Sequence, residues 1–216
     1  AKPIAAPRRA QQFPAVVPVG AGEHEPPLPP PPIPVPAFPR RTLLFDLETQ
    51  RSAEEVGSWR HAHRMLVAVG VVCHLQEGEF RVYREPQLNE LVAWLDSADA
   101  VIGFNSRQFD YRVLEGYTGV EYERKWPTLD LLADIHRRLG FRLSLAHLAQ
   151  ATLGVDKTAD GLQSLEWVRA GRLELVEEYC RRDVEILRDL YLYGRRMGFV
   201  VYRDLDEKAV KLPVDW

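Results

Sequence analysis

The pattern of hydrophobic and polar positions first predicts strands. Apolar, β-branched and aromatic residues fill Thr42–Leu47, which is typical of a central strand. Met65–Leu75 and Glu79–Arg84 are predicted as two further strands, joined in a hairpin by the turn Gln76-Glu77-Gly78. Ala100–Phe104 is again strand-like. The part of the chain that follows residue 41 is therefore expected to supply most of a sheet.

Helical spacing dominates further along the chain. Leucine and valine recur three and four positions apart within Gln87–Asp96, and Asn105 or Ser106 can cap the helix after the fourth strand. Strands that include a hairpin, followed by alternating strands and helices, indicate an α/β domain with a mixed sheet flanked by helices. The remaining predicted elements are a short strand at Pro127–Leu129, helices over Leu129–Leu139, Ser144–Thr152, Leu162–Ala170 and Leu173–Met197, the last ending at Gly198, and a last strand or extended tail at Phe199–Arg203.

A proline-rich segment precedes this domain. Thirteen of the sixteen prolines lie between Pro3 and Pro39, and a segment so poor in backbone donors is expected to be extended. It can serve as a spacer or as a docking peptide for a protein partner. We therefore expect residues 1–40 to be a tail or linker, residues 41–203 to be the domain, and residues 204–216 to be a C-terminal tail.

Composition and charge narrow the class of protein. The chain has 216 residues, 46% of them hydrophobic, which is enough for one ordinary core. The net charge of −3 gives no global basic field, although a local basic rim can still bind nucleic acid. Cys73 and Cys180 fit neither a metal-ligand spacing nor a disulfide framework. With no membrane-length apolar run and no secretory signal, the expectation is a soluble cytoplasmic protein.

The first candidate for chemistry is the pair Asp46 and Glu48 at the end of the first strand. Side chains alternate along a strand, so these two acids project from the same face. Two carboxylates side by side repel one another, and burying both is costly unless a cation lies between them. The alternative is a solvated strand end that carries two surface acids.

Two more acids follow on predicted helices. Asp110, between Phe109 and Tyr111, lies on a partly apolar helix face, although an aspartate in a first turn can simply stabilise the helix dipole. Asp183 lies beside an apolar stripe of the long helix, and Tyr179 stands four positions before it, on the same face. A surface ion pair with a neighbouring arginine is the alternative explanation for Asp183.

Taken together, these signals resemble the three exonuclease motifs of the DEDD family. Asp46 and Glu48 on a strand, then Asn-x-x-x-Phe-Asp ending at Asp110, then Tyr-x-x-x-Asp ending at Asp183, follow the order of that family. The chain is similar to the tyrosine subclass, as in the proofreading domains of family B DNA polymerases and their stand-alone bacterial relatives. The histidine subclass would have a histidine at position 178, where this chain has Glu178. The resemblance spans residues 42–203.

The resemblance implies a ribonuclease-H-like fold and a metal-dependent 3′→5′ exonuclease that acts on nucleic acid with a 3′ end. It implies that Asp46, Glu48, Asp110 and Asp183 hold two divalent ions, Mg²⁺ or Mn²⁺, and that Tyr179 orients the attacking water. Hard oxygen ligands suit these ions, whereas zinc ligation by Cys or His is not supported.

Expected substrate contacts lie around these motifs. They are Leu47, Thr49, Asn105, Arg107 and Lys157, with Arg60 and Trp59 among further residues that can contact phosphate or stack on a base.

Other readings stay open from the sequence alone. An enzyme of the same fold can cut internally or act on RNA ends. A weakly active or inactive nucleic-acid-binding module, tethered by the proline-rich tail to a helicase or repair partner, is a further alternative. The presence of all four acids and the tyrosine favours an active enzyme. The sequence does not indicate the oligomeric state, and no feature of it clearly reads a 2′-hydroxyl to separate RNA from DNA. Single-stranded DNA is nevertheless the substrate that we favour.

Overall fold

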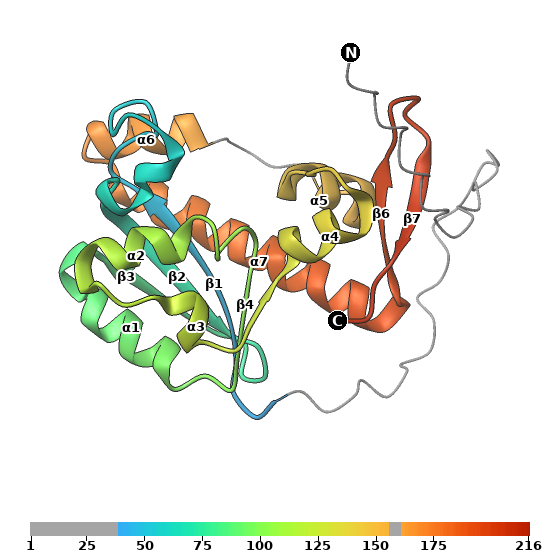
Figure 1. The fold of residues 1–216 in the computed structure, drawn as a ribbon, viewed down its shortest axis with the longest axis horizontal. Helices are drawn as coiled ribbons and strands as arrows, with labels where there is room; N and C mark the ends of the chain where they lie inside the picture. The colour runs from blue at the N-terminus through green and yellow to red at the C-terminus, as the bar shows by residue number, and fades with distance from the viewer. Residues whose placement is uncertain (1–38, 156–160) are drawn as a thin grey trace, which may run out of the picture.

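A computed structural model of the chain describes residues 39–155 and 161–216 (Figure 1). Residues 1–38 of the proline-rich segment lie outside the described residues. The elements, in chain order, are β1 (Thr42–Thr49), the 3-10 helix η1 (Trp59–Arg64), β2 (Val67–His74), β3 (Glu79–Arg84), the 3-10 helix η2 (Glu85–Gln87), α1 (Leu88–Asp96), β4 (Ala100–Gly103), α2 (Asp110–Thr118), α3 (Tyr122–Lys125), β5 (Thr128–Asp130), α4 (Leu131–Leu139), α5 (Leu145–Leu153), α6 (Gly161–Arg169), α7 (Leu173–Met197), β6 (Phe199–Arg203) and β7 (Ala209–Pro213).

Five strands form one mixed sheet in the order β3-β2-β1-β4-β5. The antiparallel hairpin of β2 and β3 extends the sheet on one side of β1, while β4 and β5 run parallel to β1 on the other. The pairing of β1 with β4 covers only Thr42–Leu44, whereas its pairing with β2 continues to Thr49. The carboxyl-terminal half of β1 therefore has a strand neighbour on one edge only.

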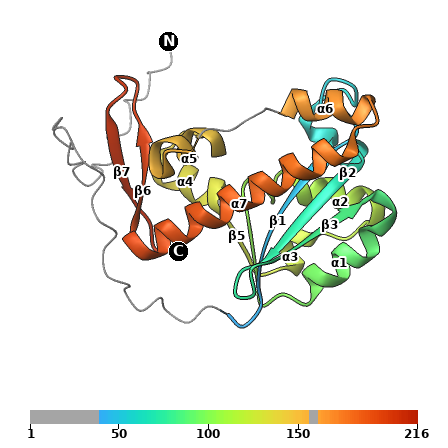
Figure 2. The same ribbon diagram turned by 180° about the vertical axis from the view of Figure 1, so that it is seen from behind.

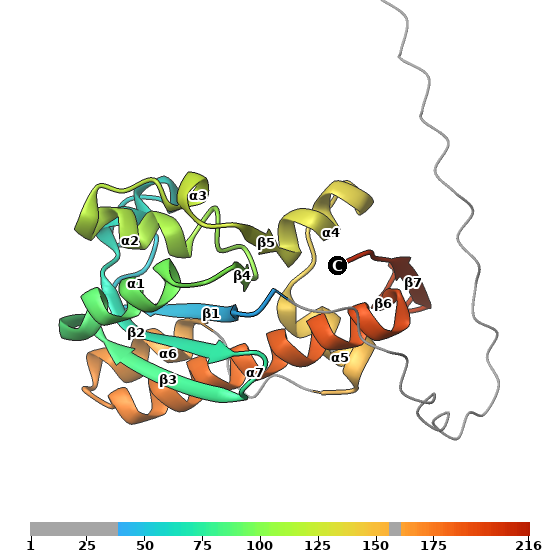
Figure 3. The same ribbon diagram turned by 90° about the horizontal axis from the view of Figure 1, so that it is seen from below.

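Helices cover both faces of the sheet, as Figures 2 and 3 show. Leu43, Phe45 and Leu47 of β1 pack into a buried cluster with side chains of α1, α2 and α3. Leu44 points to the other face and packs into a second cluster with residues of α4, α5 and α7. The predicted fold class, a mixed α/β sheet flanked by helices, is confirmed. No described helix is both long and apolar enough to cross a membrane.

Two local features differ from the sequence expectation. Neither Asn105 nor Ser106 caps α2, which begins at Asp110 after Phe109 without a side-chain cap. The physical reason is that Asn105 adopts a left-handed conformation, with φ of 68°, and starts a tight turn before the helix. The other difference lies in the stretch 204–216, which we expected to be a tail. This stretch contains β7, which pairs with β6.

Candidate active site

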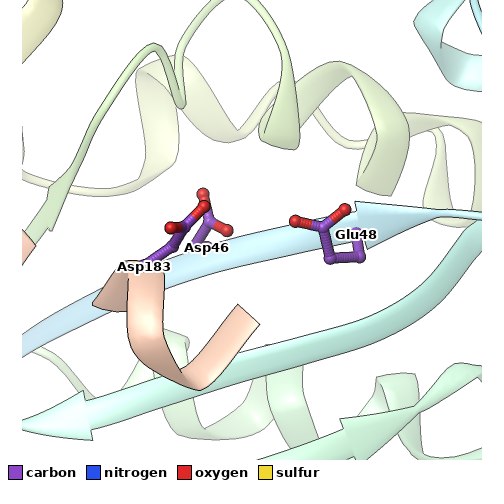
Figure 4. Close-up of side chains that lie close together, drawn as sticks. All are labelled: Asp46, Glu48 and Asp183. Atoms are coloured by element: carbon purple, nitrogen blue, oxygen red, sulfur yellow. The ribbon is translucent and has the colours of Figure 1, made fainter. Parts of the chain in front are cut away.

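Three carboxylates converge above the sheet. Asp46 and Glu48 extend from β1, and Asp183 extends from α7, with the three side chains gathered in Figure 4. One carboxylate oxygen from each residue lies within 4.8 Å of the others. Asp183 is buried and the two acids of β1 are partly buried. Such closeness of negative charges is unfavourable without a compensating cation.

Alternation along β1 explains how the site forms. Asp46 and Glu48 lie on the same side of the strand as Leu44, which packs against the cluster that includes α7. Helix α7 faces this side through a buried stripe that contains Val176, Cys180 and Val184, with Asp183 beside it. Apolar packing of the helix therefore brings Asp183 to the acids of the strand.

Asp110 lies next to this group and is fixed by the backbone of β1. Its Oδ1 accepts a hydrogen bond of 3.0 Å from the N–H of Leu47, between Asp46 and Glu48 in the sequence. This N–H lies beyond the part of β1 that pairs with β4, so a carboxylate takes the place of a neighbouring strand. Burial first, and then the charge of Asp46, raise the pKa of Asp110 well above its usual range.

A buried aspartate that the sequence reasoning did not select organises the turn before Asp110. Asp130, at the end of β5, accepts hydrogen bonds from the N–H of Asn105 (2.9 Å) and from the N–H of Arg107 (3.1 Å). It also caps α4 by accepting from the N–H of Ala133. Asp130 is thus a positioning residue for the segment that leads into Asp110.

Tyr179 lies one turn before Asp183 on α7 and is buried. Its ring packs edge-on against Trp167, with 6.1 Å between ring centroids. Both rings line a groove of about 600 Å³ together with residues of α7, Arg181 among them. The tyrosine therefore borders an open surface groove and lies one helical turn from Asp183.

Cys180 is a further neighbour of the acids. Its thiol donates to Asp46, with the sulfur 3.5 Å from the carbonyl oxygen and 3.7 Å from Oδ2. Burial first, and then the surrounding carboxylates, raise the pKa of Cys180 well above its usual range. The thiol thus stays protonated and serves Asp46 as a weak donor.

The expected substrate contacts have different surroundings. The Leu47 side chain is buried in the core, and the Thr49 hydroxyl donates to the carbonyl oxygen of Arg51. The Arg107 guanidinium donates to the carbonyl oxygen of Thr128. The Asn105 side chain accepts a hydrogen bond of 2.7 Å from Arg142, a residue that the sequence reasoning missed because it lies far away along the chain. Lys157 lies outside the described residues.

Comparison with known proteins identifies the family to which this fold belongs. The sequence model of the RNase H superfamily matches residues 43–194, which include all of the five-stranded sheet but the first residue of β1. The chain belongs to the RNase H superfamily. None of the curated proteins compared with this RNase H superfamily chain matches it.

Two solved structures resemble this RNase H superfamily domain. The family B DNA polymerase from the hyperthermophilic archaeon Pyrobaculum calidifontis aligns with a TM-score of 0.56 and 19% identity, over 73% of this chain and 25% of the polymerase. RNase D from Trypanosoma brucei aligns with a TM-score of 0.49 and 12% identity, over 73% of this chain and 57% of RNase D. The present chain therefore matches only a part of each of these proteins. At 19% identity, the polymerase likeness shows a shared fold.

The acidic cluster of this RNase H superfamily domain can hold a metal ion. Asp46, Glu48 and Asp183 offer carboxylate oxygens from two elements that tertiary packing brings together. Carboxylate oxygens are the ligands that Mg²⁺ and Mn²⁺ prefer, and no histidine or thiolate belongs to the cluster within the described ranges. Donor chemistry and spacing both fit a hard divalent cation.

Proposed function

We propose that this chain is a metal-dependent 3′→5′ exonuclease of the tyrosine subclass, which hydrolyses phosphodiester bonds at the 3′ end of nucleic acid, with single-stranded DNA favoured. One observation carries the proposal. Acids from the first strand and the last long helix, Asp46, Glu48 and Asp183, lie together, and the acid of the middle motif, Asp110, is bonded to the strand between them. Membership of the RNase H superfamily supports the same chemistry.

The acids, the tyrosine and the groups that position Asp110 have separate roles in this proposal. Asp46, Glu48, Asp110 and Asp183 hold two divalent ions, Mg²⁺ or Mn²⁺. When bound, such ions would supply Lewis-acid chemistry, lowering the pKa of the attacking water and stabilising charge on the leaving 3′ oxygen. Tyr179, with a phenol that is protonated at neutral pH, orients the attacking water by hydrogen bonding. Asp130 and the Leu47 N–H hold Asp110 and its preceding turn in place.

Among the expected substrate contacts, Asn105 has the strongest structural support. It lines an open groove directly before Asp110, and its conformation is set by Asp130 and Arg142. Thr49 and the backbone around Leu47 lie on the same strand as Asp46 and stay proposed contacts of the terminal nucleotide. Arg107 is less favoured because its guanidinium already binds Thr128 and lies 3.8 Å from Glu123. Lys157 also stays a prediction.

The test uses 5′-labelled single- and double-stranded DNA and RNA, incubated with Mg²⁺, Mn²⁺ or EDTA. A ladder of products shortened from the 3′ end is expected with either metal and is expected to disappear with EDTA. Asp183→Ala and Asp110→Ala are each expected to abolish hydrolysis while circular dichroism shows an intact fold. Asp206→Asn, an exposed acid on the β6–β7 turn, serves as the control and should cleave like the parent.

The product pattern also separates the alternatives. Internal products from a circular substrate would identify an endonuclease of the same fold. Full metal-dependent activity of Asp183→Ala would contradict the site assignment. Binding of single strands without hydrolysis under any metal condition would favour the reading as a tethered binding module.

A further inference from the structure

A basic groove opens beside the acidic cluster. It has a volume of about 750 Å³ and is formed by η1, by the turn and first residues of α2, and by the connection between α4 and α5. Three arginines and no acid are found among the described residues that line it. These residues are Trp59, Arg60, Asn105, Gln108, Phe109, Arg112 and Arg142. In a chain with a net charge of −3, this is a local concentration of positive charge.

The position of the groove relative to the acids follows from the turn before α2. Gln108 and Phe109 line the groove and are followed directly by Asp110. The Asp110 carboxylate is bonded to the N–H of Leu47, which separates Asp46 from Glu48. A strand whose 3′ end lies at the acids can therefore continue into the groove over the side chains that precede Asp110.

Trp59 adds an exposed aromatic side chain to the groove. Its side chain is 68% exposed, whereas Trp94 and Trp126 are nearly buried. The indole contacts the ring of Phe109 in a T-shaped arrangement, with 5.6 Å between centroids, and most of Trp59 stays exposed to solvent. An exposed indole bordered by arginines suits a stacking platform for a planar base.

Arg142 and Arg112 supply positive charge to the groove from two different elements, the α4–α5 connection and α2. Arg142 is fixed by its hydrogen bond to the Asn105 side chain, which points its guanidinium toward the turn before Asp110. Arg112 forms an ion pair with Glu115 at 3.2 Å, and its side chain is still about half exposed. Arginines that border an exposed indole are the combination that binds the backbone and bases of a single strand.

We propose that the groove binds the nucleotides just upstream of the scissile bond, with an unpaired base stacked on Trp59 and phosphates bound by Arg60, Arg112 and Arg142. The inference rests on the proposed function and deepens it by naming the substrate as an unpaired 3′ strand. Stacking on an indole requires a base that is free of its duplex partner. The groove therefore selects single-stranded 3′ ends over blunt duplex ends.

Binding is measured with the full chain carrying Asp183→Asn, in Ca²⁺, so that cleavage does not consume the probe. The probe is a short 5′-fluorescein oligothymidylate, followed by fluorescence anisotropy. Trp59→Ala is expected to weaken binding by about 5- to 150-fold, the usual effect of losing one base–aromatic stack. Trp59→Phe should restore part of the affinity. Arg142→Gln should also reduce the slope of log K against log salt by about 0.7, as for one lost phosphate contact.

Matched controls lie away from the groove. Arg124→Gln removes an arginine that is 85% exposed and paired with Glu121, and Leu205→Ala removes a fully exposed apolar side chain on the β6–β7 turn. Both variants should bind the probe like the parent. A blunt duplex should bind more weakly than the single strand, and its affinity should not respond to Trp59→Ala.

The outcomes separate this inference from the proposed function. The groove assignment is overturned if Trp59→Ala and Arg142→Gln both bind the single strand with unchanged affinity. This holds whether or not the protein with the natural Asp183 hydrolyses nucleic acid. Weakened binding in these variants supports the groove, even if the unsubstituted protein cleaves nothing with Mg²⁺ or Mn²⁺. That second result would overturn the proposed exonuclease activity alone.

Discussion

At the scale of single residues, the site depends on carboxylates that disfavour one another in the metal-free protein. Asp110 illustrates this most clearly, because it is buried, accepts a hydrogen bond from the backbone of Leu47 and lies close enough to Asp46 for that charge to raise its pKa. Its raised pKa means that the native state prefers the protonated acid more than the unfolded state does. This group therefore costs no stability below its unfolded pKa, and the cost grows as the pH rises through the folded pKa.

Asp110→Asn is predicted to raise the melting temperature of the metal-free protein at neutral pH. The amide oxygen can still accept from the Leu47 N–H, while the cost of burying an ionisable carboxyl group is removed. Each kcal/mol gained corresponds to about 2–4 °C in a domain of this size. The gain should shrink toward pH 4. Calorimetry in EDTA across this pH range measures it, and a lower melting temperature at pH 7 would show that the Asp110 charge is already compensated.

Metal addition is predicted to stabilise the unsubstituted protein more than the variants that lack one of the acids. Mn²⁺ or Mg²⁺ at about 100 times its dissociation constant should stabilise the unsubstituted protein by about 2.7 kcal/mol. Asp110→Asn and Asp183→Asn should gain less from the metal, because each removes a negative ligand. An equal metal-induced shift in all three proteins, measured by calorimetry, would place the ion elsewhere.

Tyr179 allows a separate test of catalysis against structure. Tyr179→Phe keeps the ring contact with Trp167 and removes only the hydroxyl. Turnover is predicted to fall, whereas the metal concentration that gives half-maximal activity should stay the same. Single-turnover rates as a function of Mn²⁺ concentration distinguish the two effects. An unchanged rate would limit Tyr179 to packing against the neighbouring helix α6.

At the scale of elements, long periodic segments were the most predictable part of the fold. The predicted bounds of α7 agree with the structure, because its apolar positions repeat at helical spacing over many residues. Those of β3 also agree, because its apolar and polar residues alternate along a short segment that follows a turn. Helix α2 was less predictable, since its start depends on Asp130, a residue brought to the turn at Asn105 by the sheet. Such a contact has no local sequence signal.

The position of η1 depends on one close approach to α2. A Cβ added to Gly116 would lie 2.0 Å from the carbonyl oxygen of His63, and backbone cannot move aside as a flexible side chain can. Gly116 therefore lets η1, with Trp59 and Arg60, lie directly against α2. The glycine has no turn or cap role in α2, so sequence patterning alone did not reveal this function.

Gly116→Ala is predicted to destabilise the protein by about 1–3 kcal/mol, as other overpacked contacts do, and to weaken single-strand binding by displacing η1. Gly161→Ala is the matched control, because a Cβ there meets no atom of the described residues within 4 Å. Thermal unfolding and anisotropy with the oligothymidylate probe measure the two effects. Parent-like affinity in a destabilised Gly116→Ala protein would mean that η1 does not form part of the binding groove.

At the scale of the whole molecule, the sequence predicted the sheet and the order of the acidic motifs but not how the C-terminal residues pack. Leu212 and Val214 are buried in the cluster that also contains Val184 and Leu187 of α7, and Val210 is buried as well. Their alternation was a usable strand signal, but it is short and interrupted by Pro213. The consequence for the proposed site is indirect, since these residues pack on the helix that also carries Tyr179 and Asp183.

Trp216 joins this C-terminal segment to the helical layer. Its ring stacks on Tyr191 and lies over Gly194, where an added Cβ would come within 2.5 Å of it. Its indole N–H donates to Asp134 Oδ2 at 2.8 Å. Burial raises the pKa of Asp134, but hydrogen bonds from Arg138 and Trp216 oppose this effect, and the net pKa is lowered.

Trp216→Ala is therefore predicted to lower stability by about 1–3 kcal/mol, while leaving hydrolysis unchanged below the melting transition. Because the N–H stabilises the charged form of Asp134, the part of the loss due to that bond should be present above the unfolded pKa near 3.9 and fade as the pH falls below it. Trp59→Ala, the same change at an exposed position, should hardly alter the melting temperature. Equal melting temperatures for Trp216→Ala and the parent would show that the C-terminal strand and its tryptophan lie on the domain without stabilising it.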